Sequence, residues 1–251
     1  MIILGIESAS MVASVALVAD GITMAEYTVN FKKTHSQTLL PMIDQMVSMV
    51  GLELKNLDGI AVSGGPGSFT GLRIGSATAK GLGLALNKPL LHVPTLDAMA
   101  YGFFGTSSLL CPMMDARRNQ VYTGLYHCES ELEILKPSCA MDIRELMEEI
   151  NRQKEPVILL GDGVPVHQVV CENCLNVPFS FAPAHLNRQR AASVAALGSV
   201  YLAEGKTETA AEHAPDYLRK AQAERELEEA RRQGKMAELA AGHSVGTGDN
   251  S

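Results

Sequence analysis

The chain has 251 residues, a formal net charge of −7 and 46% hydrophobic residues. A chain of this length buries about 70% of its unfolded surface, so its core needs no disulfide or metal. The acidic balance disfavours a free-standing nucleic-acid-binding protein, which normally carries a basic patch. Five cysteines, an odd number, do not suit a disulfide framework. We therefore expect a cytoplasmic protein with no signal peptide and no membrane span.

Strand and helix patterns alternate over the first hundred residues. The predicted strands are 2–6, 13–19, 22–29, 59–63 and 90–93, and the predicted helices are 34–50 and 70–86. Asp20-Gly21 is a typical hairpin turn between two of these strands. A meander followed by strand–helix–strand units predicts an α/β fold with a mixed sheet.

The pattern is less regular after Pro94. The predicted strands are 109–114, 120–126 and 157–160, and the predicted helices are 142–151, 191–204 and 217–240. We predict three parts: an N-terminal lobe at 1–100, a C-terminal lobe at 101–216, and a charged helix with a frayed tail at 217–251.

A glycine-rich segment, Ser63 to Gly75, lies between a predicted strand and a predicted helix. Backbone N–H groups at such a turn and helix N-terminus form a natural anion site. The candidate residues of an anion or nucleotide-like loop are Gly64, Gly65, Gly67, Ser68, Thr70 and Arg73. The alternative is a tight turn capped by Ser68 or Thr70, because glycine first serves backbone geometry. The spacing does not match a P-loop.

Catalytic and metal motifs are weaker. Ser63 lies one residue away from a Gly-x-Ser-x-Gly pattern, and His92 or His185 would have to serve as its base. The Gly-Gly-Pro-Gly run that follows Ser63 is a poor helix start, however. No two histidines have the i, i+4 spacing of a helical metal site, and Cys171-x-x-Cys174 has no second pair. We predict no metal site and no catalytic residue.

Two helices carry apolar or small-residue faces that need a partner. Small residues recur every fourth position in the 70–86 helix, at Gly71, Gly75, Ala79 and Gly83. The 34–50 helix has an apolar stripe that methionines extend, formed by Leu39, Met42, Ile43, Met46 and Met49. Both faces fit either a docking surface for a partner or the internal core, and the pattern alone does not separate these two interpretations.

Arg117 and Arg118 occupy a polar turn between two predicted strands. An ordinary solvated hairpin explains them. The functional alternative is an arginine pair that contacts a phosphate or a partner's carboxylate.

Several motifs together resemble the TsaB (YeaZ) family. They are the opening 2–8, His35-Ser36, 64–75, 114–118, 161–163, 190–198 and 215–219, and the resemblance runs from Met1 to about Glu224. It implies the two-lobed actin/hexokinase/Hsp70-like (ASKHA) fold, an α/β class with mixed sheets flanked by helices. It also implies a partner subunit in the attachment of threonylcarbamoyl to adenosine 37 of tRNAs that read codons starting with A.

The resemblance implies that this chain forms a heterodimer with the catalytic, metal-binding paralogue TsaD and supports the ATPase TsaE. The chain lacks the His-x-x-x-His pair of a TsaD-type subunit, and Glu7 stands where actin-like ATPases usually carry Asp. We therefore expect no cofactor on this chain, ATP and metal on the partner subunits, and only indirect contact with tRNA. The resemblance favours the interface interpretation of the two helices, through which the isolated chain could also homodimerise. The alternatives are a stand-alone actin-like ATPase or kinase, and a glycopeptidase-like hydrolase.

Overall fold

The computed structural model describes residues 1–31 and 34–218. The predicted 217–240 helix and the tail after it therefore lie, apart from their first two residues, outside the described residues. Among the helices of the described residues, none is long and apolar enough to cross a membrane.

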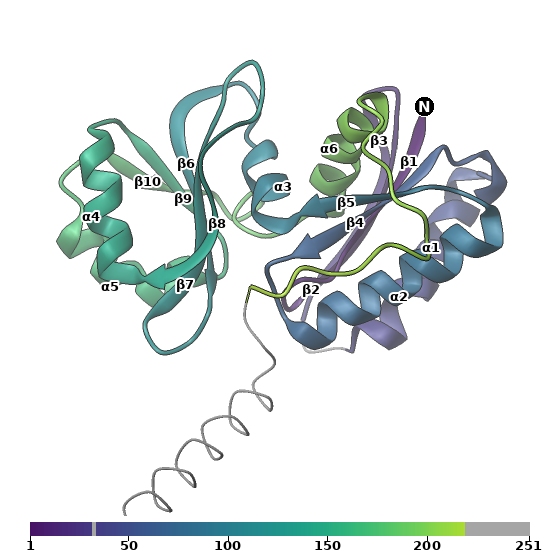
Figure 1. The fold of residues 1–251 in the computed structure, drawn as a ribbon, viewed down its shortest axis with the longest axis horizontal. Helices are drawn as coiled ribbons and strands as arrows, with labels where there is room; N and C mark the ends of the chain where they lie inside the picture. The colour runs from purple at the N-terminus through teal and green to yellow at the C-terminus, as the bar shows by residue number, and fades with distance from the viewer. Residues whose placement is uncertain (32–33, 219–251) are drawn as a thin grey trace, which may run out of the picture. The chain divides into compact units, whose positions relative to one another are not determined.

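The first sheet contains the predicted meander and two parallel strands (Figure 1). Its strands are β1 (Ile2–Glu7), β2 (Val12–Ala19), β3 (Ile22–Asn30), β4 (Gly59–Gly65) and β5 (Leu90–Pro94), in the order β3-β2-β1-β4-β5. β1, β2 and β3 pair antiparallel, whereas β4 pairs parallel to both β1 and β5. Asp20 and Gly21 both have positive φ angles, 47° and 79°, which confirms the predicted hairpin turn.

Helices cover both faces of this sheet. On one face lie α1 (His35–Val50) and α2 (Phe69–Leu86), which form a core cluster with Leu4 and Ile6 of β1. On the other face lie α3 (Thr95–Tyr101) and α6 (Ala191–Ala203), which pack in a second cluster with Ile3. Because β1 is buried on both faces, its sequence reads as a continuous apolar run.

The second sheet has the order β10-β9-β6-β7-β8 and its own core. Its strands are β6 (Thr106–Asp115), β7 (Gln120–Cys128), β8 (Glu133–Asp142), β9 (Val157–Leu160) and β10 (Phe179–Phe181), and its helices are α4 (Ile143–Gln153) and α5 (Gly163–Cys174). The sequence prediction missed α3, β8, α5 and β10. Most of β8 is at least partly exposed and it contains Pro137, so neither alternation nor an apolar run marks it.

The segment after β10 returns to the first sheet. α6 packs on β1, β2, β4 and β5, and Glu208 forms an isolated antiparallel bridge with Leu90 of β5. The predicted range of 101–216 for a C-terminal lobe is therefore too long at its end, because 191–216 packs on the N-terminal lobe. The predicted α/β class, with two mixed sheets flanked by helices, is confirmed.

Two helical glycines give a matched test of this packing. A Cβ atom at Gly198 of α6 would lie 2.6 Å from the Cβ of Ala61 in β4, whereas one at Gly81 of α2 would meet nothing within 4 Å. We expect Gly81→Ala to raise the free energy of unfolding by about 1 kcal/mol through helix propensity. Gly198→Ala should lower it by about 1–3 kcal/mol through overpacking, despite the same propensity gain. Urea unfolding of both variants measures the difference, and equal effects at the two sites would contradict the placement of α6.

Candidate functional site

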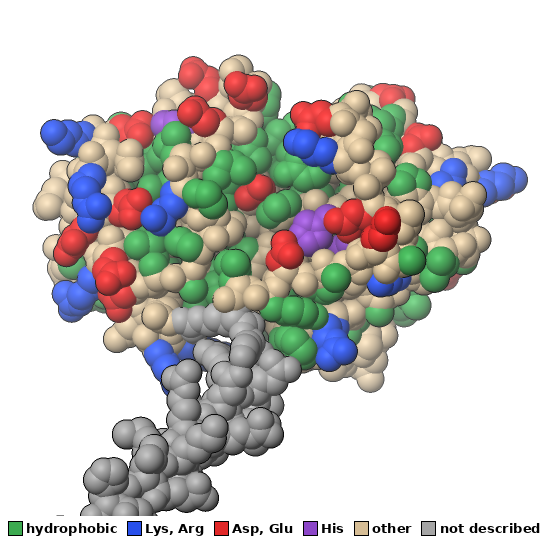
Figure 2. Space-filling view, viewed as in Figure 1, with side chains coloured by type: hydrophobic (Ala, Val, Ile, Leu, Met, Phe, Trp, Pro, Cys, Tyr) green, Lys and Arg blue, Asp and Glu red, His purple; other side chains and the backbone are tan. Residues whose placement is uncertain are grey.

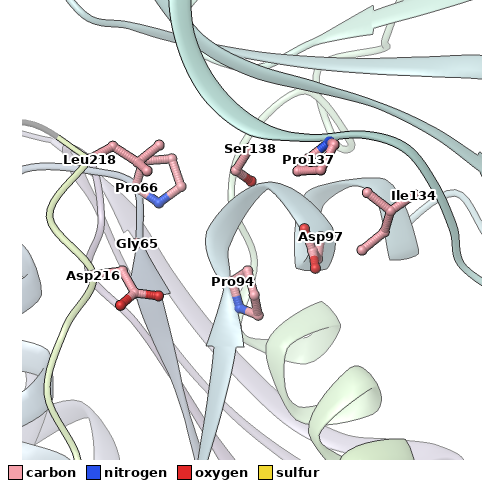
Figure 3. Close-up of a pocket in the computed structure, with 9 residues that line it drawn as sticks. All are labelled: Gly65, Pro66, Pro94, Asp97, Ile134, Pro137, Ser138, Asp216 and Leu218. Atoms are coloured by element: carbon pink, nitrogen blue, oxygen red, sulfur yellow. The ribbon is translucent and has the colours of Figure 1, made fainter.

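A cleft of about 290 Å³ is bordered by elements of both sheets and by the end of the described chain. Figure 3 shows its nine lining residues: Gly65, Pro66, Pro94, Asp97, Ile134, Pro137, Ser138, Asp216 and Leu218. The first sheet's β4, the turn after it, the end of β5 and α3 form one wall. β8 of the second sheet forms the opposite wall. The lining is mainly apolar, and its charged members are two carboxylates.

Both carboxylates are held by specific partners. The Tyr126 hydroxyl donates to Asp97 Oδ1 at 2.9 Å and lies 3.3 Å from Ser138 Oγ. Burial raises the pKa of Asp97, and the hydrogen bond from Tyr126 lowers it. Asp216 Oδ2 lies 3.1 Å from His92 Nε2, and the Asp216 N–H donates to the Gly64 carbonyl at 2.7 Å. Sequence analysis did not single out Asp97, and its only signal for Asp216 was the 215–219 motif.

The charge of the cleft does not suit a phosphate chain. None of its nine lining residues is Lys or Arg, whereas nucleotide triphosphates need cationic or N–H donor partners. Asp97 and Asp216 would repel phosphates unless a cation lay between them. The arrangement favours an uncharged or cationic occupant, or none.

The glycine-rich loop borders the cleft, but part of its hydrogen-bonding capacity is used within the chain. The Ser68 N–H donates to the Ala9 carbonyl at 2.6 Å, and Ser68 Oγ caps α2 by accepting from the Gly71 N–H at 3.3 Å. Ser68 as cap is the alternative that sequence analysis left open. Gly65 lines the cleft, with φ at 122°, where a side chain would be strained.

The other predicted loop residues do not gather at the cleft. Thr70 is exposed. The Arg73 guanidinium lies 5.1 Å from the centre of the Phe69 ring, outside the cleft lining. The His92 ring occupies the space that a Cβ at Gly64 would need, and Gly67 packs on the Ala9 carbonyl. Anion binding by this loop stays a prediction.

The small-residue ridge of α2 faces the interior of this chain. A Cβ at Gly71 would collide with the Ser8 carbonyl, and one at Gly75 would collide with Ser8 Oγ. The Ser8 hydroxyl also donates to the Gly71 carbonyl at 2.9 Å. Ala79 is fully buried, and Gly83 packs on Leu90. The structure therefore corrects the prediction that these four residues contact a partner: their smallness lets α2 approach β1.

The apolar stripe of α1 is also internal. Leu39, Met42, Ile43 and Met46 are buried in the cluster between α1 and the first sheet, so their predicted contact with a partner is corrected too. Met49 is different, because 73% of it is exposed. Of the nine predicted interface residues, only Met49 is available on the surface.

The outward faces of α1 and α2 carry other apolar and small residues. Leu40 of α1 is 53% exposed and Leu84 of α2 is 70% exposed. Ala77 and Gly81 are exposed on α2, and Pro41 is exposed on α1. The two helices lie against each other on one face of the first sheet (Figure 1), and these exposed residues lie on the sides of the helices that do not pack on the sheet. We call Leu40, Pro41, Met49, Ala77, Gly81 and Leu84 the α1/α2 surface.

Ser63 does not pair with either histidine that was considered as its base. Its side chain is buried, and its Oγ accepts from the Ser8 N–H at 3.3 Å. His92, the nearer candidate base, is hydrogen-bonded to Asp216 instead. His185 is exposed in the segment after β10. In the described part of the chain the geometry does not support a serine hydrolase.

Glu7 is the most strongly perturbed carboxyl group of the site. It is buried at the end of β1, and burial raises its pKa to about 7, against the lowering effect of hydrogen bonds from Ala9 N–H and Ser63. Asp162, just before α5, raises it further, and burial raises the pKa of Asp162 as well. Asp162 Oδ1 is buried without a hydrogen-bond partner among the described residues. The buried Glu7 carboxyl group thus interacts electrostatically with Asp162, a half-buried residue at the start of α5.

The predicted arginine pair lies in the β6–β7 turn. The Arg117 side chain is 87% exposed, with Nε 3.7 Å from Asp115 Oδ2. Arg117, Arg118 and Asn119 all have positive φ angles, so the turn is tightly wound. Arg118 is exposed as well. The structure places both arginines outside the cleft lining, and contact with tRNA stays a prediction.

The pKa of Glu7 leads to a pH-dependent stability. Its folded-state pKa of about 7 lies above the unfolded value of 4.5, so protonation favours the folded state. This contribution is fully present below pH 4.5 and is lost as the pH rises through 7. Relative to wild type, Glu7→Gln should gain up to about 3 kcal/mol of stability between pH 5 and pH 8. Urea unfolding across this range measures the difference. The exposed Glu53→Gln is the control, and a Glu7→Gln profile parallel to wild type would refute the prediction.

Solved structures share the fold of this chain. YeaZ from Pseudomonas aeruginosa matches with a TM-score of 0.72 and 24% identity, over 86% of this chain and 99% of that one. An activator of 2-hydroxyisocaproyl-CoA dehydratase from Clostridium difficile, solved with bound ADPNP, matches with a TM-score of 0.50 and 12% identity, over 82% of this chain and 97% of that one. At these identities the likeness concerns the fold alone.

Sequence comparisons are more specific. Residues 25–227 match the family model "TsaD: tRNA N6-adenosine threonylcarbamoyltransferase". The tRNA threonylcarbamoyladenosine biosynthesis protein TsaB of Bacillus subtilis is 33% identical over 89% of this chain and 96% of its own length. The TsaB protein of Escherichia coli is 35% identical over 60% of this chain and 68% of its own length. The chain therefore belongs to the TsaB (YeaZ) family of tRNA threonylcarbamoyladenosine biosynthesis proteins.

Proposed function

We propose that this chain is a non-catalytic partner subunit in threonylcarbamoyl transfer to adenosine 37 of tRNA. In this proposal it forms a heterodimer with the catalytic paralogue TsaD and supports the ATPase TsaE. The observation that carries the proposal is the α1/α2 surface, where apolar and small residues stay exposed on two adjacent helices of one sheet face. Exposed apolar residues gathered on neighbouring helices are typical of a protein–protein contact.

The chemistry of the cleft supports a non-catalytic role. Its two carboxylates and its lack of lining cations oppose the binding of an adenylate or triphosphate. Ser63 is buried, and its hydroxyl contacts Ser8 and the buried Glu7 rather than a histidine. ATP and the metal are therefore assigned to the partner subunits.

The α1/α2 surface suits close helix packing. A Cβ at Gly81 would meet nothing within 4 Å, and Ala77 lies one helical turn before it on the same exposed side. Small residues at this spacing let a second helix approach, and Leu40, Met49 and Leu84 add exposed apolar area around them. Without the partner, a second copy of this chain fits the same surface, so a homodimer of the isolated protein follows from the same proposal.

Ala77→Arg tests the docking surface. Because Ala77 is exposed, the longer side chain leaves the fold intact but places an unpaired charge in the contact. We expect the affinity for TsaD to fall at least about 10-fold, about 1.4 kcal/mol. Formation of threonylcarbamoyladenosine in a reconstituted reaction should fall with it. Affinity is measured by calorimetry with purified TsaD.

Val169→Arg is the matched control. Val169 is 68% exposed on α5, on the second sheet's part of the chain, so its substitution should leave TsaD binding unchanged. Unchanged binding by Ala77→Arg, or an equal loss in both variants, would refute docking through α1 and α2. Substitutions at Gly75 or Ala79 would test core packing instead, because both residues are buried.

A direct binding measurement distinguishes a stand-alone ATPase or kinase from the proposed non-catalytic partner subunit. Calorimetry of the isolated chain with ATP and Mg²⁺ should detect no binding if the cleft carboxylates exclude the phosphates. Tight binding or turnover by the isolated chain would favour the alternative function.

A further inference from the structure

Three side chains of metal-ligating type lie together beside β5, outside the docking surface. His92 comes from β5, whereas Glu208 and His213 come from the segment after α6. Each offers one ligand atom, and the three atoms lie within 4.8 Å of one another. In Figure 2, a histidine flanked by acidic side chains reaches the surface over the position that β5 has in Figure 1.

Backbone contacts hold the cluster in place. Leu90 and Glu208 exchange both of their N–H···O hydrogen bonds, each at 2.9 Å, so Glu208 lies beside the strand that carries His92. Beyond His213, the Asp216 N–H donates to the Gly64 carbonyl at 2.7 Å. The ligand atoms therefore come from segments that are already fixed to the first sheet, which lowers the ordering cost of binding an ion.

One ring nitrogen of His213 has no hydrogen-bond partner in the described part of the chain. The His213 side chain is fully buried, and its Nδ1 lies 2.9 Å from Glu208 Oε2. Its Nε2 is buried with no hydrogen-bond partner among the described residues, although buried ring nitrogens are normally satisfied. The two ring nitrogens of His213 therefore differ, because Nδ1 faces Glu208 within the cluster and Nε2 has no partner among the described residues.

The charges around the cluster favour a cation. Glu208 and Asp216 are two carboxylates, and Asp216 Oδ2 lies 3.1 Å from His92 Nε2. Lys80 carries a positive charge, which opposes the binding of a cation, and its Nζ donates to the His213 carbonyl at 2.8 Å.

We propose that His92, Glu208 and His213 bind one divalent transition-metal ion, with Zn²⁺ as the best-matched ion and Asp216 adjacent to it. Imidazole nitrogens and a carboxylate are ligands that Zn²⁺ accepts readily. Tetrahedral coordination at about 2.1 Å places ligand atoms about 3.4 Å apart. Ligand atoms that lie up to 4.8 Å apart must therefore move closer together when an ion binds. Glu208 can make this movement because its side chain is 38% exposed.

The ion would connect the end of the described chain to the cleft. It would tie the 208–213 segment to β5, while Asp216 both pairs with His92 and lines the cleft. This role is independent of docking on TsaD, because none of the three ligands belongs to the α1/α2 surface.

The test is a titration of the full chain with ZnCl2, followed by calorimetry and by a competing chelator. We expect one ion per chain and a rise in Tm of about 5–10 °C at 100-fold excess over Kd. His92→Gln and Glu208→Gln should each weaken binding at least about 10-fold. Glu208→Gln keeps the shape of a partly exposed side chain, so it preserves the fold, which circular dichroism checks.

His127→Gln is the matched control, because His127 Nε2 also lies near a carboxylate, 3.4 Å from Glu155 Oε1, but outside the cluster. It should bind Zn²⁺ like wild type. CoCl2 is a second probe: a tetrahedral Co²⁺ spectrum without a thiolate charge-transfer band supports the site. A thiolate band would assign the ion to cysteines instead. That band, no stoichiometric binding, or equal affinity in wild type and Glu208→Gln would each overturn the proposal.

Discussion

The close approach of α2 to the end of β1 is the contact on which the rest of the structure depends. Gly71 and Gly75 leave no room for side chains, because the Ser8 carbonyl and hydroxyl fill the space where their Cβ atoms would be. Ser68 adds a cap to α2 and a backbone hydrogen bond to Ala9. This contact buries Glu7 and fixes the glycine-rich loop at the edge of the cleft. It also determines which side of α2 remains exposed.

A helix with small residues on two sides can therefore pack closely against a different neighbour on each side. The side with Gly71, Gly75, Ala79 and Gly83 is used within the chain. The opposite side, with Ala77 and Gly81, is exposed. Sequence periodicity identified the first side but does not state which neighbour fills it. The family resemblance then favoured a partner. The exposed side follows the same spacing and would have been found by extending the pattern around the helix.

Much of the fold could be predicted from the sequence because its strongest elements carry local signals. The Asp20-Gly21 turn, the buried β9 and the Gly51 C-cap of α1, at φ 69°, are determined by neighbours in the chain. The elements that were missed, such as β8 and α5, have no clear period, because their burial depends on residues far away in the sequence. The same limit applies to the site. Asp97 is held by a hydrogen bond from Tyr126 on β7, which lies far from it in the sequence. The His92 ring contacts the His213 ring only because the chain returns to the first sheet after it has formed the second.

The return of the chain after α6 also changes what the acidic composition means. A net charge of −7 argued against nucleic-acid binding, but it did not show where the carboxylates lie. The structure places Asp216 at the cleft and Glu208 beside two imidazoles, and it buries Glu7 near Asp162. Carboxylates in these positions repel a phosphate chain and attract a cation. This charge arrangement supports the proposal that a partner subunit performs the phosphate chemistry, because a cleft lined by carboxylates disfavours binding of an adenylate or of the tRNA backbone.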